Sequence, residues 1–371
     1  MRTRVTDMFG IEFPIFAFSH CRDVVAAVSR AGGMGVLGAL YFTPEELETE
    51  LKWIDDHVDG RPYGVDVVMP ASYAGADLGV DSPQDLVARL QGMIPEGHRR
   101  FVDDLLAAHD VPPLGEDSDA GRVLLGWTDA TARPQVEVAL RHPIALLANA
   151  LGPPPADIVE LAHAHGVKVA ALASTPRHAV KQVEVGVDVV VAQGTEAGGH
   201  TGEISTMVLV PQVVDAVDVP VLAAGGIGDG RQMAAGMALG AEGVWTGSIW
   251  LTVEEADTPE MAKRRILEAT SRDTVRSRSW TGKPARLLKN EWTDAWESAE
   301  SPGTLPMPLQ FMLISDALRR IGRSDAAELA TFPAGQIIGT MNQVRSARDV
   351  VFGMVEQYVE AMDRLERLTR D

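Results

Sequence analysis

The sequence predicts an α/β protein whose main domain is a (β/α)8 barrel. Short apolar runs rich in β-branched residues alternate with longer amphipathic stretches, a pattern typical of a parallel sheet covered by helices. Eight such runs can be counted, and eight strand-helix units are the number that closes a barrel. The predicted strands span residues 12–18, 33–40, 63–70, 142–151, 167–173, 187–194, 219–227 and 242–251.

Start and stop signals support the helices between these runs. Thr43 is expected to cap a helix that begins at Pro44 and carries glutamates in its first turn, where the helix dipole favours negative charge. The amphipathic stretches before Gly166 and Gly240 end at a residue suited to the left-handed cap of a helix.

Two parts of the chain depart from this alternation. Residues 71–130 hold two helical patterns between the third and fourth predicted strands, so we predict an inserted helical segment, a lid or subdomain. After residue 270 the alternation stops. We therefore divide the chain into a barrel of residues 1–270, which contains the insertion, and a C-terminal extension of residues 271–371 that packs near the barrel mouth and ends in an amphipathic helix.

Composition excludes several classes of function. A formal net charge of −19 and the lack of Lys/Arg-rich runs argue against binding to nucleic acid or to anionic membranes. No apolar run approaches the roughly 20 residues of a membrane-spanning helix. Cys21 is the one cysteine of the chain, which excludes an intramolecular disulfide and favours a cytoplasmic protein.

The turn after the sixth predicted strand is the first candidate for a site. The strand "VDVVVAQG" leads directly into "TEAGGHTG", so His200 lies at the carboxyl end of a barrel strand, where active sites of such barrels are found. Gly198 and Gly199 permit positive φ angles and close approach of the backbone to a ligand. The alternative is a turn that needs glycine for its geometry alone, with a solvated histidine.

A second glycine cluster favours the functional interpretation. Gly225 and Gly226 end the seventh predicted strand, and Gly247 and Ser248 lie near the end of the eighth. In a (β/α)8 barrel these two loops commonly bind phosphate, because backbone amides and a helix N-terminus converge on the anion there.

Other chemistries lack their residue patterns. His163 and His165 are two positions apart and do not share a helix face, so no metal site is predicted. Lys168 starts the fifth predicted strand, at the wrong end of the barrel for a Schiff base, and Cys21 has no evident activating group. The remaining features of the predicted site are a phosphate-binding pair of loops, a glycine-lined wall and one histidine. Together they suit FMN, which would itself perform the redox chemistry.

The sequence resembles the nitronate monooxygenase family, which includes flavin-dependent enoyl and quinone reductases. The similarity extends over most of the chain and is carried by "FGIEFPI", "VSRAGGMGVLGALYFTPEEL", "PIALLANALGPP", "AQGTEAGGHTGE", "LAAGGIGDGRQMAAGMALGAEGVWTGS", "GKPARLLKN" and "FPAGQIIG". The resemblance implies a (β/α)8 barrel with FMN and a catalytic histidine at His200. It also implies a set of cofactor-binding residues, namely Asp66, Gln193, Gly194, Gly199, Gly225, Gly226, Gly247, Ser248 and Gln336.

If the family's chemistry holds, His200 removes the proton next to a nitro group, or positions an anionic nitronate, and dioxygen reoxidises the flavin. An imidazole suits both roles because its pKa lies near neutral pH and its cationic form pairs with an anion. The expected partners are thus a small-molecule substrate and dioxygen, and the chain could assemble as a homo-oligomer.

Two positions depart from the family pattern. The first strand ends in "FAFSH", with His20 and Cys21 where a small-residue Ala-Pro-Met stretch is usual. Asp66 replaces an asparagine beside the flavin, and a negative charge there would disfavour an anionic reduced flavin.

Four further side chains near the predicted site each have a functional and a structural interpretation. His20 faces the same mouth and is either a second catalytic candidate or a capping residue. Trp245 and Trp250 are expected to pack within the last strand, and Arg286 either neutralises a substrate anion or forms a surface ion pair.

The leading prediction is FMN-dependent oxidation of alkyl nitronates or nitroalkanes by dioxygen. The alternatives are an NAD(P)H-dependent reductase of quinones or enoyl thioesters on the same scaffold, and a flavin-binding protein without turnover.

Overall fold

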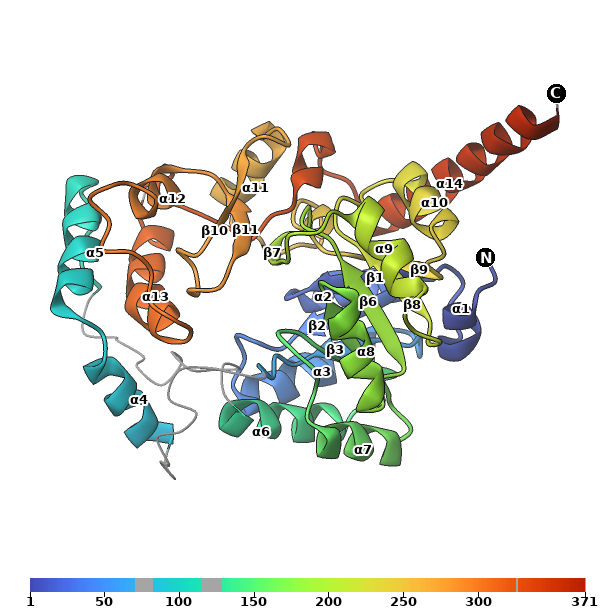
Figure 1. Ribbon diagram of the computed structural model, residues 1–371, viewed down its shortest axis with the longest axis horizontal. Helices are drawn as coiled ribbons and strands as arrows, with labels where there is room; N and C mark the ends of the chain where they lie inside the picture. Colours follow the sequence, from blue (N-terminus) through green and yellow to red (C-terminus); the bar gives the residue numbers. More distant parts are fainter. Residues whose placement is uncertain (71–82, 115–128, 325, 371) are drawn as a thin grey trace.

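The computed structural model describes residues 1–70, 83–114, 129–324 and 326–370. Residues 71–82 and 115–128, which belong to the predicted insertion 71–130, lie outside the described residues. The predicted (β/α)8 barrel is confirmed, because eight parallel strands close on themselves in the order β1-β2-β3-β4-β5-β6-β8-β9 (Figure 1). These strands are β1 (Ile15–Ser19), β2 (Met34–Gly38), β3 (Gly64–Asp66), β4 (Leu146–Asn149), β5 (Lys168–Ala173), β6 (Val189–Gln193), β8 (Val221–Ala224) and β9 (Gly243–Thr246).

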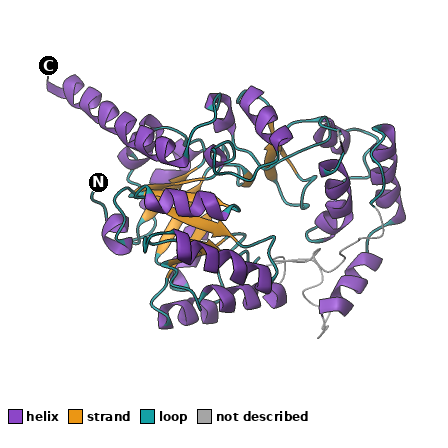
Figure 2. Cartoon of the chain, turned by 180° about the vertical axis from the view of Figure 1, so that it is seen from behind, coloured by secondary structure: helices purple, strands orange, loops and turns teal. Residues whose placement is uncertain are grey.

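A layer of helices covers the barrel from outside (Figure 2). The predicted cap of α3 is present: the Thr43 hydroxyl accepts from the Glu46 amide, and the Glu46 carboxylate accepts from the Thr43 amide. The helices between the barrel strands that pack on it are α2 (Arg22–Arg30), α3 (Pro44–His57), α6 (Asp129–Ala139), α7 (Ala156–Ala164), α8 (Pro176–Glu184), α9 (Thr206–Val214) and α10 (Gly230–Ala238).

The two termini complete the barrel. Helix α1 (Arg4–Phe9) closes its amino end, since Val5 and Phe9 share a core cluster with the inward-facing side chains of the strands. Helix α14 (Ala347–Arg370) packs against α10 and α2. One end of the barrel is therefore plugged, and a ligand can enter only at the other.

A second core lies beside the barrel. Helices α4 (Pro83–Gly92) and α5 (Glu96–Ala108) from the insertion pack with α12 (Glu291–Trp296) and α13 (Leu309–Gly322) from the extension. The rings of Phe101 and Trp296 meet edge to face at 5.0 Å. Segments about 200 residues apart in sequence thus bury one another's apolar faces.

The extension also adds a small antiparallel sheet to the barrel. Strands β10 (Thr274–Ser277) and β11 (Ala285–Leu288) pair with each other, and β11 pairs with β7 (Gly199–His200). The last elements, α11 (Glu260–Glu268) and the 3-10 helices η2 (Ser248–Trp250) and η3 (Gln336–Thr340), follow β9 and the sheet. Among the described residues, no helix has both the length and the apolarity to cross a bilayer.

Candidate active site

A cavity of about 1130 Å³ lies at the carboxyl ends of the barrel strands. Every strand contributes to its wall at or just after its last residue, as Ser19, Gly38, Asp66, Ala150, Ser174, Gln193, Ala224 and Thr246 illustrate. The extension closes part of the rim through Trp280, Lys283 and the segment around Pro333. The cavity is thus built where ligands of such barrels bind.

Eight of the ten predicted site residues line this cavity, and two do not. The residues in the wall are Asp66, Gln193, Gly199, His200, Gly225, Gly226, Gly247 and Ser248. Gly194 faces the start of α9 instead, where a Cβ would lie 2.1 Å from the Thr206 hydroxyl, so its small size serves packing. Gln336 begins η3, and its amide donates to the carbonyl of Glu196, while its neighbours Gly335 and Ile337 reach the cavity.

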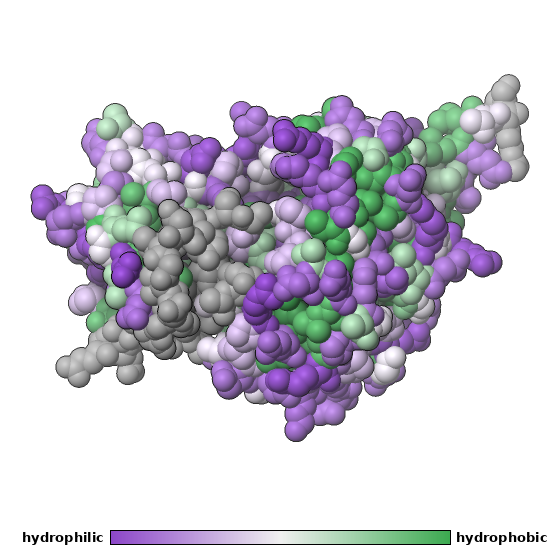
Figure 3. Space-filling view, turned by 60° about the horizontal axis from the view of Figure 1, so that its bottom comes forward, coloured by the Kyte–Doolittle hydropathy of each residue, from purple (hydrophilic) through white to green (hydrophobic). Residues whose placement is uncertain are grey.

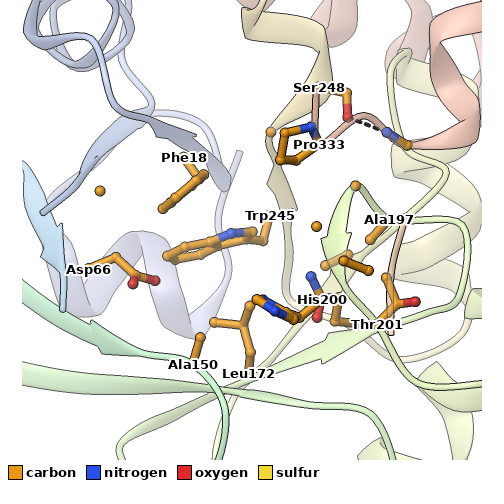
Figure 4. A pocket seen from close by; sticks show the side chains of 18 of the residues that line it. Phe18, Asp66, Ala150, Leu172, Ala197, His200, Thr201, Trp245, Ser248 and Pro333 are labelled. Carbon is orange, nitrogen blue, oxygen red and sulfur yellow. Dashed lines mark hydrogen bonds between the residues drawn. The ribbon is translucent and has the colours of Figure 1, made fainter. Parts of the chain in front are cut away.

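The glycine-rich end of the cavity is made of backbone. Gly225 and Gly226 have φ angles of +96° and +70°, a left-handed conformation that L-residues with side chains rarely adopt. Ser248 lies on the turn after β9 and lines the same cavity, and its hydroxyl accepts from the amide of Gly335 at 2.8 Å (Figure 4). Two turns from neighbouring strands therefore present main chain to one region, as a phosphate site requires.

His200 projects from β7 into the cavity (Figure 4). Its Nε2 lies 2.6 Å from the hydroxyl of Thr281 on the extension, and its strand position pairs with Ala285. Burial, followed by the positive charge of Lys283, lowers the pKa of His200 from 6.5 to about 4. The imidazole is therefore neutral at pH 7, and the expectation of a pKa near neutrality, with a cationic ring pairing with the substrate, was wrong.

Asp66 ends β3 and is buried at the cavity wall, where its carboxyl group faces Trp245 (Figure 4). Burial raises the pKa of Asp66 from 3.8 to about 7. A carboxyl with this pKa is about half protonated at neutral pH, so about half of the negative charge expected from the sequence is removed.

Comparison with known proteins identifies the family of this chain. The family model of nitronate monooxygenase matches residues 2–357. The chain belongs to the nitronate monooxygenase family. It is therefore an oxidoreductase, and the alternative of a protein without turnover is not supported.

Individual relatives extend the family assignment. A Mycobacterium tuberculosis protein that bears the name of a monooxygenase is 55% identical, with 100% of both chains covered. Among solved structures, a nitroalkane oxidase from Streptomyces ansochromogenes is similar with a TM-score of 0.81 and 29% identity, covering 97% of this chain and 99% of that one. FabK from Thermotoga maritima gives a TM-score of 0.76 and 27% identity, with 99% of each chain covered.

His20 and Cys21 follow β1 directly and also line the cavity. The Nδ1 of His20 lies 2.8 Å from the Gly38 carbonyl, and its ring centroid lies 4.8 Å from that of Tyr41. Burial lowers the pKa of His20. Cys21 is buried as the residue before α2, and burial raises the pKa of its thiol, so it is not an activated nucleophile.

Three tertiary features were not expected. Trp245 lines the cavity and stacks on Phe16 and Phe18, so it is more than barrel packing. Trp250 lies in η2 and not in a strand, and its indole N–H donates to Thr246. Arg286 is buried and donates to the Thr195 carbonyl at 2.8 Å, so it supports the β6 to β7 turn and, within the described ranges, forms no surface ion pair.

Sequence reasoning also missed Lys283, Trp280 and Glu196 in the cavity wall. Glu196 accepts from the Thr206 amide at 3.0 Å, which fixes the turn after β6 to the start of α9. The short hairpin that carries Trp280 and Lys283 had no strand signal strong enough to predict its pairing with β7. Among the described residues, no cluster of His, Cys, Asp or Glu could hold a metal ion.

Proposed function

We propose that this enzyme binds FMN in the cavity and oxidises alkyl nitronates, or the parent nitroalkanes, with dioxygen. The observation that carries the proposal is the pairing of a glycine-built end, suited to a phosphate, with a neutral imidazole in the wall of the same cavity. Family membership supports it, since the family is that of nitronate monooxygenase.

The described residues fit such a cofactor. Gly225, Gly226 and Gly247 present only main chain to the cavity, and Ser248 lines the same cavity, so an FMN phosphate would be held by amides and one hydroxyl. The aromatic face of Trp245 and the polar groups of Asp66 would border the flavin ring, which combines an apolar body with polar edges. When bound, FMN supplies the acceptor for two electrons and the reaction with dioxygen.

His200 would hold or move the proton at the reacting carbon. The neutral ring has one nitrogen able to accept a proton, and Thr281 holds its orientation through Nε2. A base with a pKa of about 4 is weak, and general-base catalysis is poor when the pKa of the base lies far below the working pH. A nitronate arrives already deprotonated, and for this reason we propose nitronates, rather than nitroalkanes, as the preferred substrates.

Absorbance spectroscopy tests this proposal. The purified protein, if needed after incubation with FMN, is expected to show a flavin spectrum between about 300 and 500 nm. Anaerobic addition of propyl-1-nitronate should bleach it, and air should restore it. If reconstituted protein binds no flavin, the cofactor assignment is wrong; if flavin is bound but no nitronate bleaches it, the substrate assignment is wrong.

The second candidate is an NAD(P)H-dependent reductase of quinones or enoyl thioesters. The basic side chains Lys181 and Lys283 in the cavity wall favour it, because phosphates of a dinucleotide or of a thioester carrier would pair with them. Anaerobic bleaching by NADH or NADPH, with no bleaching by the nitronate, would replace the first candidate with this one.

We further propose that the protein is cytoplasmic, where the buried thiol of Cys21 stays reduced, and that it forms a symmetric dimer. The end of α14 extends beyond the barrel and carries apolar residues (Figures 1 and 3), of which Leu365 and Leu368 are exposed. In a symmetric dimer these exposed leucines of the two copies would pack against each other.

Light scattering coupled to size-exclusion chromatography measures the assembly. The mass of a dimer is expected for the wild type and that of a monomer for L365E/L368E. A monomeric wild type would exclude the dimer.

A further inference from the structure

Two arginines lie opposite each other in the small sheet that joins the extension to the barrel. In the register of this sheet, Arg276 of β10 pairs with Arg286 of β11, and Arg286 pairs on its other side with Gly199 of β7 (Figure 1). Like charges at directly opposite positions of an antiparallel sheet destabilise the pair of strands. The two arginines therefore call for a negative partner that offsets this cost.

The side chains of both arginines point away from the active-site cavity. Successive side chains of a strand lie on opposite faces of a sheet. The next pair in the register, His200 and Ala285, lines the cavity, whereas Arg276 and Arg286 are not among the described residues of its wall. The two guanidinium groups thus lie on the other face of the sheet, outside the proposed active site.

The protein itself fixes the position of Arg286. Its Nε donates to the Thr195 carbonyl at 2.8 Å, and its Nη1 donates to the Thr274 hydroxyl at 3.2 Å. Burial, followed by the positive charge of Arg276, lowers the pKa of Arg286. The two guanidinium groups are therefore close enough to repel each other.

Arg276 has hydrogen-bonding capacity that the protein does not use. Its Nε is buried and, among the described residues, has no hydrogen-bond partner. Its Nη2 lies 3.6 Å from a carboxylate oxygen of Glu203, whose side chain is 86% exposed, so this ion pair is weak. A buried N–H group without an acceptor costs free energy, and a bound acceptor would recover it.

The acidic side chains around the pair do not neutralise it. Glu203 is the exposed partner of Arg276. The negative charge of Glu196 acts on Arg286, but the carboxylate of Glu196 already accepts from the amide and the hydroxyl of Thr206. Positive charge is thus left on this face of the sheet, in a chain with a formal net charge of −19.

We propose that Arg276 and Arg286 form a binding site for a small, doubly charged oxyanion of the class of inorganic phosphate and sulfate. A guanidinium group matches the oxygens of such an anion, and two of these groups match its charge. Because Arg276 belongs to β10 and Arg286 holds the turn after β6, a bound anion would tie the extension to the turn that leads to His200. The site requires neither a flavin nor a nitronate.

A phosphate titration tests this site. Thermal unfolding of the FMN-loaded protein is followed in increasing phosphate, with sodium chloride used to keep the ionic strength constant, and the rise in Tm gives an apparent Kd. Loading with FMN keeps inorganic phosphate out of the glycine-built end of the cavity. The proteins compared are the wild type, R276M, E203Q and K289M. Lys289 is a half-exposed cation just after β11 and serves as the charge-matched control.

We expect phosphate to raise the Tm of the wild type and of K289M to the same extent. R276M should raise the apparent Kd for phosphate by about 10- to 100-fold, the loss that follows removal of a charge-assisted hydrogen bond. E203Q should lower the apparent Kd, because it removes the carboxylate that competes for Arg276. Sulfate should act as phosphate does.

Two results would overturn the site: no rise in the Tm of the wild type beyond that in sodium chloride, or an equal rise in R276M. Circular dichroism verifies that R276M is folded, and R276Q replaces it if it is not. A protein that takes up no flavin would overturn the proposed function alone, since the difference between the wild type and R276M arises outside the cavity.

Discussion

Two histidines, His20 and His200, line one cavity, yet different parts of the chain hold them. The ring of His20 is bonded to the main chain of β2 and packed against Phe18 and Tyr41, all within the barrel. The ring of His200 is bonded to a side chain of the extension and lies under the influence of Lys283. Burial lowers the pKa of both, so burial alone does not separate them.

The difference shows how this enzyme assigns roles to like residues. We expect His20 to have a structural function, because its ring is bonded to a backbone carbonyl and packs against two aromatic rings. His200 is instead positioned by a hydroxyl of the extension and lies beside the positive charge of Lys283. The extension thus adds a hydrogen bond and a positive charge to the effect of burial at His200.

The largest expected effect comes from the same substitution at both positions. H200N is expected to lower kcat/KM for a nitroalkane, whose proton must be removed, by about 10²- to 10⁴-fold, the usual loss for a group that handles a proton in the transition state. H20N is expected to lose less than about 10-fold, since it does not act on the reacting atoms. Steady-state kinetics with flavin content measured in parallel makes the comparison, and comparable losses would remove the distinction.

The buried carboxyl group of Asp66 is expected to change stability with pH in the opposite direction to the buried histidines. The pKa of Asp66 is raised from 3.8 to about 7, so between these values the folded state binds more protons than the unfolded state and stability falls as pH rises. D66N should abolish this fall and stabilise the protein at pH 8 by up to about 4 kcal/mol. Urea unfolding of both proteins from pH 4 to pH 8 measures the free energy of unfolding at each pH. If this free energy depends on pH in the same way for D66N and wild type, the pKa of Asp66 is not raised.

The pH dependence of stability provides a third way to separate the histidines. The folded pKa of His200 lies below its unfolded value of 6.5, so its contribution is fully present above pH 6.5 and is lost as pH falls toward about 4. H200N should remove up to about 3 kcal/mol of that acid-side loss. Urea unfolding of H200N and wild type at pH 5 and pH 7 gives the change in the free energy of unfolding between the two pH values. If this change is the same for both proteins, the pKa of His200 is not lowered in the folded state.

The smallest effect is expected from H20N at pH 8, where both histidines are neutral. Loss of the hydrogen bond to the Gly38 carbonyl should reduce the free energy of unfolding by about 1 kcal/mol. Thermal unfolding followed by circular dichroism measures it, with H57N as a control, since His57 bonds to a backbone carbonyl on the exposed face of α3. A greater loss of stability for H57N than for H20N would argue against the structural role of His20.

Local sequence determined the barrel and much of its mouth. Three signals depend only on neighbouring residues and can be interpreted without the rest of the chain. They are the periodic spacing of apolar residues, helix caps such as Thr43, and the turn glycines Gly225 and Gly226. Because the carboxyl ends of parallel strands meet at one end of a barrel, placing His200 and Asp66 after strands was enough to bring both to one cavity.

Only the tertiary structure decided what these residues can do. The hairpin that carries Thr281 and Lys283 pairs with β7 across more than 80 residues, and such pairing leaves no local signal in the sequence. The pKa values of His200 and Asp66 depend on how many groups exclude water around them, which is a property of packing. Gly194 was predicted on the turn after the sixth strand and Gln336 from the resemblance, but neither lines the cavity, and only the path of the backbone decides which neighbours do.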